Sequence, residues 1–293
     1  MSFSSDSADA TAAFARGYTI EATRPKPAEI AAVVGIVGSG REFYLSSVPT
    51  QTLPELADLA AQTRGAGLEP VVHLAARRLT SKAELDDFLA RLRGEADVRR
   101  VLVIAGDVDQ AGPYADALDV IRGGRLREAG IENIGISGYP EGHAHIAPDK
   151  IDAALPAKLS AADDAGLRVH IVSQFAFDAA PIVSWLKRLR ARGVTVPVQI
   201  GMAGPTSLTA LLRYAKRCGV NASMRGMATG AAAGLFGNVG PDKIVEALAA
   251  EAAGLGAIAP HYFSFGGVAA TARYAHDRAQ DLASRMSASH AMT

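Results

Sequence analysis

A short loop holds the densest group of reactive side chains in the sequence. Residues 137–143 read Ser-Gly-Tyr-Pro-Glu-Gly-His and follow the apolar residues 134–136. An apolar run of this kind is typical of a buried strand, and an amphipathic helical pattern begins a few residues later. In folds built from repeated strands and helices, such loops carry catalytic and binding residues. The loop therefore places a phenol, a carboxylate and an imidazole in one candidate site.

The elements that must position this loop repeat along the chain. Helical patterns alternate with short strand-like runs, and Ser81 and Ser207 are suited to cap two of the helices. Strands that alternate with helices favour a parallel sheet with right-handed crossovers. Eight such runs in 293 residues predict a single-domain α/β fold, the (β/α)8 TIM barrel, with an open doubly wound sheet as the alternative. The expected strands are 18–22, 43–48, 70–74, 100–105, 134–138, 169–175, 196–201 and 258–265; the expected helices include 53–63, 82–93, 114–129, 181–192 and 207–218.

The ends of the chain and one late segment differ from this pattern. Residues 1–10 are rich in Ser, Asp and Ala and have neither a basic nor an apolar region, so we expect a frayed start rather than a signal peptide. We therefore predict a flexible segment over 1–15 and a catalytic barrel domain over 16–293. Residues 222–240 are rich in Gly, Ala and Met, and we expect them to form an extra helix and loop before the last strand.

Composition limits the classes of partner. Lys plus Arg and Asp plus Glu number 30 each, so the chain has no charge signature of a protein that binds nucleic acid or an anionic membrane. No apolar run is long enough to span a bilayer. The single cysteine, Cys218, cannot form an internal disulfide, which fits a cytoplasmic location. We expect a small-molecule substrate, and the apolar helix faces allow a homo-oligomer.

The active site of a barrel lies at the carboxyl ends of its strands, where this sequence is rich in polar residues. Taken singly, each has a structural explanation: a lone histidine is usually a core residue, and an Asp that follows Gly often forms a turn. Their shared position at the strand ends is harder to explain by structure alone. The polar residues expected there are Glu21, Ser46, Ser47, His73, Asp107, Tyr139, Glu141, His143, Ser173, Gln174, Gln199, His261 and Ser264.

Several well-known motifs are missing from the sequence. It has no dinucleotide-binding glycine fingerprint, no phosphate loop, no His-x-x-x-His pair or cysteine cluster, and no nucleophile elbow. A Rossmann dehydrogenase, a zinc enzyme and a serine hydrolase are therefore disfavoured, and no metal site is predicted. A Schiff-base aldolase is disfavoured too, because no lysine stands at a strand end. A pocket with a few carboxylates and a glutamine suits a flat, hydrogen-bonding heterocycle.

In their order along the chain, these segments resemble the bacterial, flavin-dependent methylenetetrahydrofolate reductases. The similarity covers about residues 18–275, and its most specific parts are Gly-Tyr-Pro-Glu-Gly-His at 138–143 and Gln-Phe-Ala-Phe-Asp at 174–178. The resemblance implies a divergent member of that family: a TIM barrel that binds FAD and uses NADH or NADPH. The implied reaction reduces 5,10-methylenetetrahydrofolate to 5-methyltetrahydrofolate, in one-carbon metabolism and methionine biosynthesis.

The resemblance also implies roles for individual residues. Glu21 would be the general acid that helps to open the folate ring, and Asp107 would lie near both flavin and folate and stabilise a cationic intermediate. Gln174 would hydrogen-bond the pterin, and Tyr214 would stack on the substrate or the nicotinamide. The residues implied to contact the cofactor are Ser47, His73, Gly106, Asp107, Tyr139 and His143.

The sequence departs from the family pattern at groups that hold the flavin. Residues 105–107 read Ala-Gly-Asp where Arg-Gly-Asp is usual, and residues 159–164 lack the cations that contact the flavin phosphates. Lys158 stands one position before that segment. An arginine after the last strand is also missing from residues 265–267. The alternatives are FAD held by other cations (Arg24, Arg77 or Arg78), direct hydride transfer without a flavin, a reverse-direction paralogue in one-carbon catabolism or demethylation, and a non-catalytic folate-binding barrel.

Overall fold

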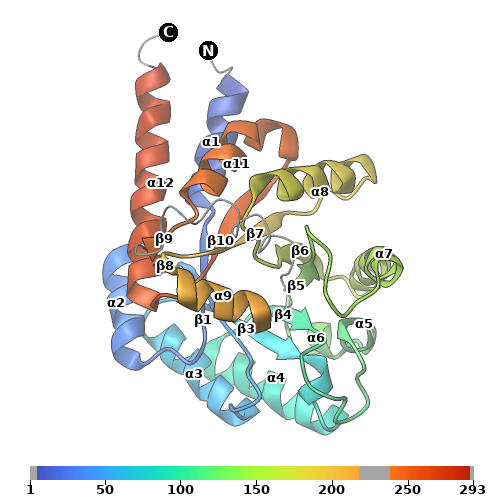
Figure 1. Ribbon diagram of the computed structural model, residues 1–293. Coiled ribbons are helices and arrows are strands. Elements are labelled where there is room, and N and C mark those ends of the chain that lie inside the picture. Colours follow the sequence, from blue (N-terminus) through green and yellow to red (C-terminus); the bar gives the residue numbers. More distant parts are fainter. Residues whose placement is uncertain (1–4, 218–237, 291–293) are drawn as a thin grey trace. The chain divides into compact units, whose positions relative to one another are not determined.

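Eight strands form the closed, all-parallel barrel that the sequence predicts. The structure, a computed structural model, describes residues 5–217 and 238–290. Around the barrel the strands follow the order β1-β10-β7-β6-β5-β4-β3-β2, and all eight predicted runs coincide with them (Figure 1). The strands are β1 Thr19–Ala22, β2 Glu42–Leu45, β3 Glu69–Ala75, β4 Arg100–Ile104, β5 Asn133–Gly138, β6 Arg168–Ser173, β7 Val198–Ala203 and β10 Ile258–Phe263.

The described chain divides into two compact units. The first contains the described parts of Met1–Ile20, Tyr139–Pro148 and Ser173–Thr293, and the second contains Glu21–Gly138 and Asp149–Val172.

In the second unit, strands β2 to β5 are joined in parallel register, with Tyr44 opposite Val71 and His73 opposite Leu102. Successive side chains of a strand point to opposite faces, so one residue in two faces inward. The buried cluster formed by Tyr44, Val71, Leu102 and Val172 represents that inner face. The helices of this unit are α2 Pro27–Val37, α3 Leu53–Gly65, η1 Ala76–Arg78, α4 Lys82–Ala96, α5 Ala117–Arg122, α6 Arg125–Glu128 and most of α7 Pro148–Asp164.

A buried polar chain crosses the inner face of the second unit. The hydroxyl of Tyr44 lies 2.9 Å from Nε2 of His170, and Nδ1 of His170 lies 2.6 Å from Oδ1 of Asn133. Because the Asn133 oxygen can only accept, His170 carries its proton on Nδ1 and Nε2 accepts from Tyr44. A Cβ at Gly135 would lie 2.9 Å from the imidazole, so this position needs glycine.

Local sequence explains most of the helix boundaries. Thr52 and Glu55 form a capping box at the start of α3, and the hydroxyl of Ser81 accepts the amide of Glu84 at the start of α4, as predicted. The single helix predicted over 114–129 is wrong. Two short helices, α5 and α6, form instead, because the chain turns at Gly123 and at Gly124, where φ is +71°.

In the first unit, β7 and β10 pair in parallel along their whole length. The segment 1–15, which the sequence predicts to be flexible, is part of helix α1 from Ser5 onward. Helix α1 packs on α11 and α12, its Phe14 and Ala15 are buried, and Thr11 donates to the carbonyl of Ala249 at 2.9 Å (Figure 1). The apolar face of α1 is therefore enough to fold this segment against the barrel helices, although its overall composition is polar. The helices are α1 Ser5–Arg16, α8 Ala179–Ala191, α9 Leu208–Arg217, α11 Asp242–Leu255 and α12 Val268–His290.

The helix and loop predicted over 222–240 lie mostly outside the described residues, as does Cys218. The short strand β9 Asn238–Val239 is described and pairs antiparallel with β8 Thr206–Ser207. Among the helices of residues 5–217 and 238–290, none combines the length and apolar character needed to cross a membrane.

Candidate active site

Glu21 is the centre of a buried hydrogen-bond network at the end of β1. The residue is only 7 % exposed. The hydroxyl of Ser46 donates to Oε1 at 2.7 Å, and Nε2 of His73 lies 3.0 Å from Oε2. Ser46 in turn accepts a hydrogen bond from Thr23 at 3.1 Å. Both carboxyl oxygens of Glu21 are therefore held, and its proton can be shared with an imidazole.

The strand pattern places these three side chains on one face. Tyr44 and Val71 belong to the inner cluster, and Ser46 and His73 each follow two residues later. A residue two positions further along a strand returns to the same face. The amide of Ser46 also donates to the carbonyl of Ala22 at 3.1 Å, which fixes the end of β2 against the end of β1.

Ser47 and Asp107 share one neighbour, the half-buried guanidinium of Arg78. Arg78 donates to the hydroxyl of Ser47 and to the carbonyl of Gln51. Burial lowers the pKa of Arg78, and the exposed carboxylate of Asp107 opposes that shift. Gln51 itself is buried, and within the described part of the chain its Oε1 has no hydrogen-bond partner.

The segment after β4 is fastened to η1 by one residue. The amide of Arg77 donates to Ala105 at 2.9 Å, its carbonyl accepts from Ala111 at 2.9 Å, and its Nε donates to Ala115 at 2.8 Å. Gly106 begins this segment with φ at +94°, a conformation that side chains other than glycine rarely adopt. These contacts fix the backbone that carries Asp107.

In the first unit, the predicted loop residues Tyr139 and His143 contact each other. Their ring centres lie 5.2 Å apart at 70°, and His145 adds a second edge contact to His143 at 5.8 Å. The amide of His145 donates to Nδ1 of His143 at 3.2 Å, so Nε2 carries the proton of the neutral ring. Burial, and then His145, lowers the pKa of His143.

The two predicted substrate residues, Gln174 and Tyr214, belong to one aromatic region of the first unit. Tyr214 stacks on Phe265 with ring centres 4.1 Å apart and planes 13° apart. Phe265 also meets the edge of Phe175 at 5.0 Å, and Oε1 of Gln174 accepts the amide of Phe175 at 3.1 Å. The cluster is completed by Phe177 and Phe263. A stacked platform beside an amide suits a flat heterocycle.

The structure thus joins Glu21 with His73, Ser47 with Asp107 through Arg78, Tyr139 with His143, and Gln174 with Tyr214 through the aromatic cluster. His261 instead binds Thr19, with Nδ1 2.7 Å from the hydroxyl, and is fully buried. Sequence reasoning did not find Gln51 or the aromatic role of Phe265. Adjacent residues of a strand face opposite sides, so the sequence alone could have assigned Ser46, which binds Glu21, and Ser47 to different faces. Nothing in the sequence indicates a role for Gln51.

Comparison with known proteins identifies the family. The family model described as methylenetetrahydrofolate reductase matches residues 47–226, more than half of the chain. The chain belongs to the methylenetetrahydrofolate reductase family. The matched range includes His73, Asp107, Tyr139, Gln174 and Tyr214, whereas Glu21 precedes it.

Individual relatives of this family are distant. Methylenetetrahydrofolate reductase 2 of Saccharomyces cerevisiae is 27% identical over 192 residues, which cover 61% of this chain and 29% of the yeast protein. The Oryza sativa protein named probable methylenetetrahydrofolate reductase (NADH) is 27% identical and covers 52% of this chain and 27% of the rice protein. The match thus spans less than a third of the length of either relative. Among solved structures, triosephosphate isomerase from Bartonella henselae has a TM-score of 0.49 and 9% identity, covering 90% of this chain and 98% of that chain.

Proposed function

We propose that this chain reduces 5,10-methylenetetrahydrofolate to 5-methyltetrahydrofolate with NADH or NADPH as the hydride source. The observation that carries the proposal is the buried network of Glu21, Ser46 and His73 in a member of this family. The name of the rice relative, which specifies NADH, favours NADH as the donor.

The reaction needs one proton and one hydride. A proton added to N10 of the folate allows the bond from N10 to the methylene carbon to break, which leaves a cationic iminium at N5. A hydride from the dihydronicotinamide then adds to the methylene carbon, so the iminium becomes an N-methyl group and the nicotinamide is oxidised. The chain must therefore supply an acid, a stabiliser of positive charge and a surface for flat rings.

Glu21 is the acid in this proposal. Ser46 holds Oε1, so Oε2 is the oxygen through which the proton is exchanged with His73. The imidazole of His73, 3.0 Å from Oε2, is close enough to return a proton to the carboxylate after each turnover. His73, which the family resemblance assigns to the flavin, acts here as a positioning and proton-supplying residue.

The other predicted residues supply binding. Asp107 is exposed and would stabilise the iminium charge, while Arg77 holds the segment that carries it. Tyr214 and Phe265 would stack on a heterocycle, and the amide of Gln174 would hydrogen-bond its edge. Tyr139 and His143 would line the part of the site that binds the nicotinamide co-substrate.

The donor set does not fit the diphosphate of FAD. Each arginine that could replace the missing family cations already binds a protein oxygen: Arg24 donates to Thr50 at 3.2 Å, Arg77 to Ala115, and Arg78 to Ser47. Lys158 is half-buried, and burial lowers its pKa.

The segment after Lys158 reinforces this mismatch. Ala161 and Ala162 are buried, and two aspartates follow them in α7. A tightly bound dinucleotide needs charge-assisted hydrogen bonds that these groups do not offer. We therefore derive no step through a flavin. A nicotinamide co-substrate binds and leaves in each turnover, so it does not need such a hold, and direct hydride transfer is the version we propose.

An absorbance spectrum and a rate measurement test the proposal. Purified protein should lack the flavin band and should oxidise NADH only when methylenetetrahydrofolate is present. A yellow, active protein would refute direct transfer but keep the reductase activity. Folate binding without any NADH or NADPH oxidation would refute the reductase and leave a non-catalytic folate-binding barrel.

A further inference from the structure

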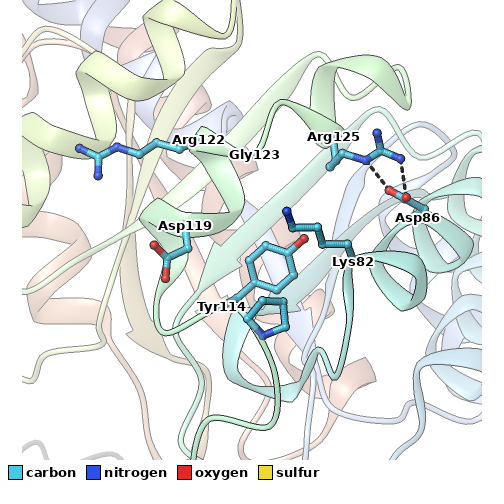
Figure 2. A pocket seen from close by; sticks show the side chains of 8 residues that line it. Lys82, Asp86, Tyr114, Asp119, Arg122, Gly123 and Arg125 are labelled. Atoms are coloured by element: carbon cyan, nitrogen blue, oxygen red, sulfur yellow. Dashed lines mark hydrogen bonds and ion pairs between the residues drawn. The ribbon is translucent and has the colours of Figure 1, made fainter.

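A cavity lies in the second unit and contains none of the predicted site residues. It has a volume of about 670 Å³ and is lined by the start of α4, the segment after β4 and helices α5 and α6 (Figure 2). Small-molecule sites commonly have volumes of several hundred cubic ångströms. The lining residues are Lys82, Asp86, Pro113, Tyr114, Asp119, Arg122, Gly123 and Arg125.

Both carboxylates of this cavity accept hydrogen bonds from the protein. Arg125 forms a two-point ion pair with Asp86, its Nε donating at 2.6 Å (Figure 2). Oδ2 of Asp119 accepts the backbone amides of Ala115 at 2.8 Å and Asp116 at 3.4 Å. Asp86 is therefore neutralised by Arg125, whereas Asp119 keeps its negative charge because backbone amides are neutral donors.

Two donors, in contrast, are unoccupied. Within the described part of the chain, neither the Lys82 ammonium nor the Tyr114 hydroxyl has a hydrogen-bond or ion-pair partner. Tyr114 is only 4 % exposed, and Figure 2 shows Lys82 and Tyr114 in the same cavity. Burial and Asp86 raise the pKa of Tyr114, so its hydroxyl remains a donor at neutral pH. A hydroxyl that lines a cavity and makes no hydrogen bond within the described residues is a donor that a ligand can use.

Charge defines what that ligand would be. The lining contains three cations and two carboxylates, so the cavity has a net positive charge. Arg122 adds to this charge from the rim, although Figure 2 shows its guanidinium extending away from Lys82. Lysine binds phosphate as a point charge, and a hydroxyl donor complements a phosphate oxygen. The cavity is much larger than inorganic phosphate alone, which leaves room for an organic group beside Pro113.

We propose that this cavity binds a small organic phosphate, whose phosphate group contacts Lys82 and Tyr114, at a site separate from that of Glu21. A phosphate placed between the Lys82 ammonium and the Tyr114 hydroxyl would accept a hydrogen bond from each of them. The site lies at the far end of the segment that begins with Gly106 and Asp107.

Calorimetric titration of the full chain with AMP, inorganic phosphate, adenosine and succinate tests the proposal. AMP and phosphate should bind, and adenosine and succinate should bind at least about tenfold more weakly, since each lacks the phosphate group. Equal binding of adenosine would show that the base, and not the phosphate, is recognised. Equal binding of succinate would overturn the assignment to phosphate. Failure of both AMP and phosphate to bind at millimolar concentration would overturn the site.

Variants locate the binding. Lys82→Ala and Tyr114→Phe should each weaken AMP binding by about tenfold or more, because each removes a hydrogen bond to a charged group. Arg127→Ala is the matched control, because Arg127 is an exposed cation of α6 outside the cavity, and it should leave binding unchanged. Glu21→Gln should also leave AMP binding unchanged, whatever its effect on turnover. Undiminished AMP binding by Lys82→Ala, or an equal loss in Arg127→Ala or Glu21→Gln, would refute the proposal.

Discussion

Replacing Glu21 by glutamine separates proton delivery from folding. The oxygen of the glutamine amide can still accept from the hydroxyl of Ser46, which lies 2.7 Å from Oε1 of Glu21. The amide nitrogen can donate to Nε2 of His73, which lies 3.0 Å from Oε2 of Glu21. Both contacts survive, so the free energy of unfolding should change by no more than about 1 kcal/mol. The proton that opens the folate ring is lost. General acid catalysis contributes roughly 10²- to 10⁴-fold, so kcat should fall by that factor.

Single-turnover oxidation of NADH in the presence of methylenetetrahydrofolate measures this loss, and a thermal melt monitors folding. Glu251→Gln is the matched control, since Glu251 pairs with Lys187 on the surface, at 2.8 Å, and such pairs contribute little to stability. A Glu21→Gln variant that folds normally and keeps its rate within about threefold would refute the assignment of Glu21 as the acid. A variant that unfolds would show instead that the network is structural.

Three further substitutions concern packing, titration and stacking. Gly135→Ala would place a Cβ 2.8 Å from Leu102 and 2.9 Å from His170, so denaturant unfolding should show a loss of about 1–3 kcal/mol; an unchanged midpoint would contradict this packing. The lowered pKa of His143 means that the unfolded chain binds more protons, so stability should fall as the pH drops below 6.5. Thermal melts of His143→Gln should show a shallower acid dependence, and identical slopes would count against the shift. Phe265→Leu removes the 4.1 Å stack on Tyr214 and should raise KM for the folate about two- to tenfold with kcat preserved; a lower kcat at constant KM would argue against a binding role.

The fold could be predicted from sequence because each strand of the barrel buries apolar side chains over a short run. The alternation of strands with helices also predicted that the strands run parallel to one another. It could not show that Ser5–Arg16 forms a helix, because the apolar face of α1 is short and becomes meaningful only against α11 and α12. The break between α5 and α6 was equally hidden, since it depends on the conformation of Gly124.

The candidate site was predicted residue by residue but not as a set of contacts. Glu21 and His73 are 52 positions apart, and their pairing depends on where β1 and β3 end. The sequence offers three arginines as alternative cations for FAD, and only the structure shows that one of them, Arg78, donates to the hydroxyl of Ser47. Phe265 belongs to the segment 265–267, from which the arginine of the family pattern is missing, and only the ring geometry shows that it stacks on Tyr214.

The three hydrogen bonds made by Arg77 bear on the speed and selectivity of this site. Loops that close over a substrate often limit turnover, because ordering them takes time and costs conformational entropy at each cycle. The segment from Ala105 to Ala115 is held at its beginning, middle and end before any ligand arrives. Its order is established once, during folding, rather than at every encounter. In the proposed reaction this segment would therefore act as a fixed template, which favours rapid capture of one substrate shape over adaptation to many.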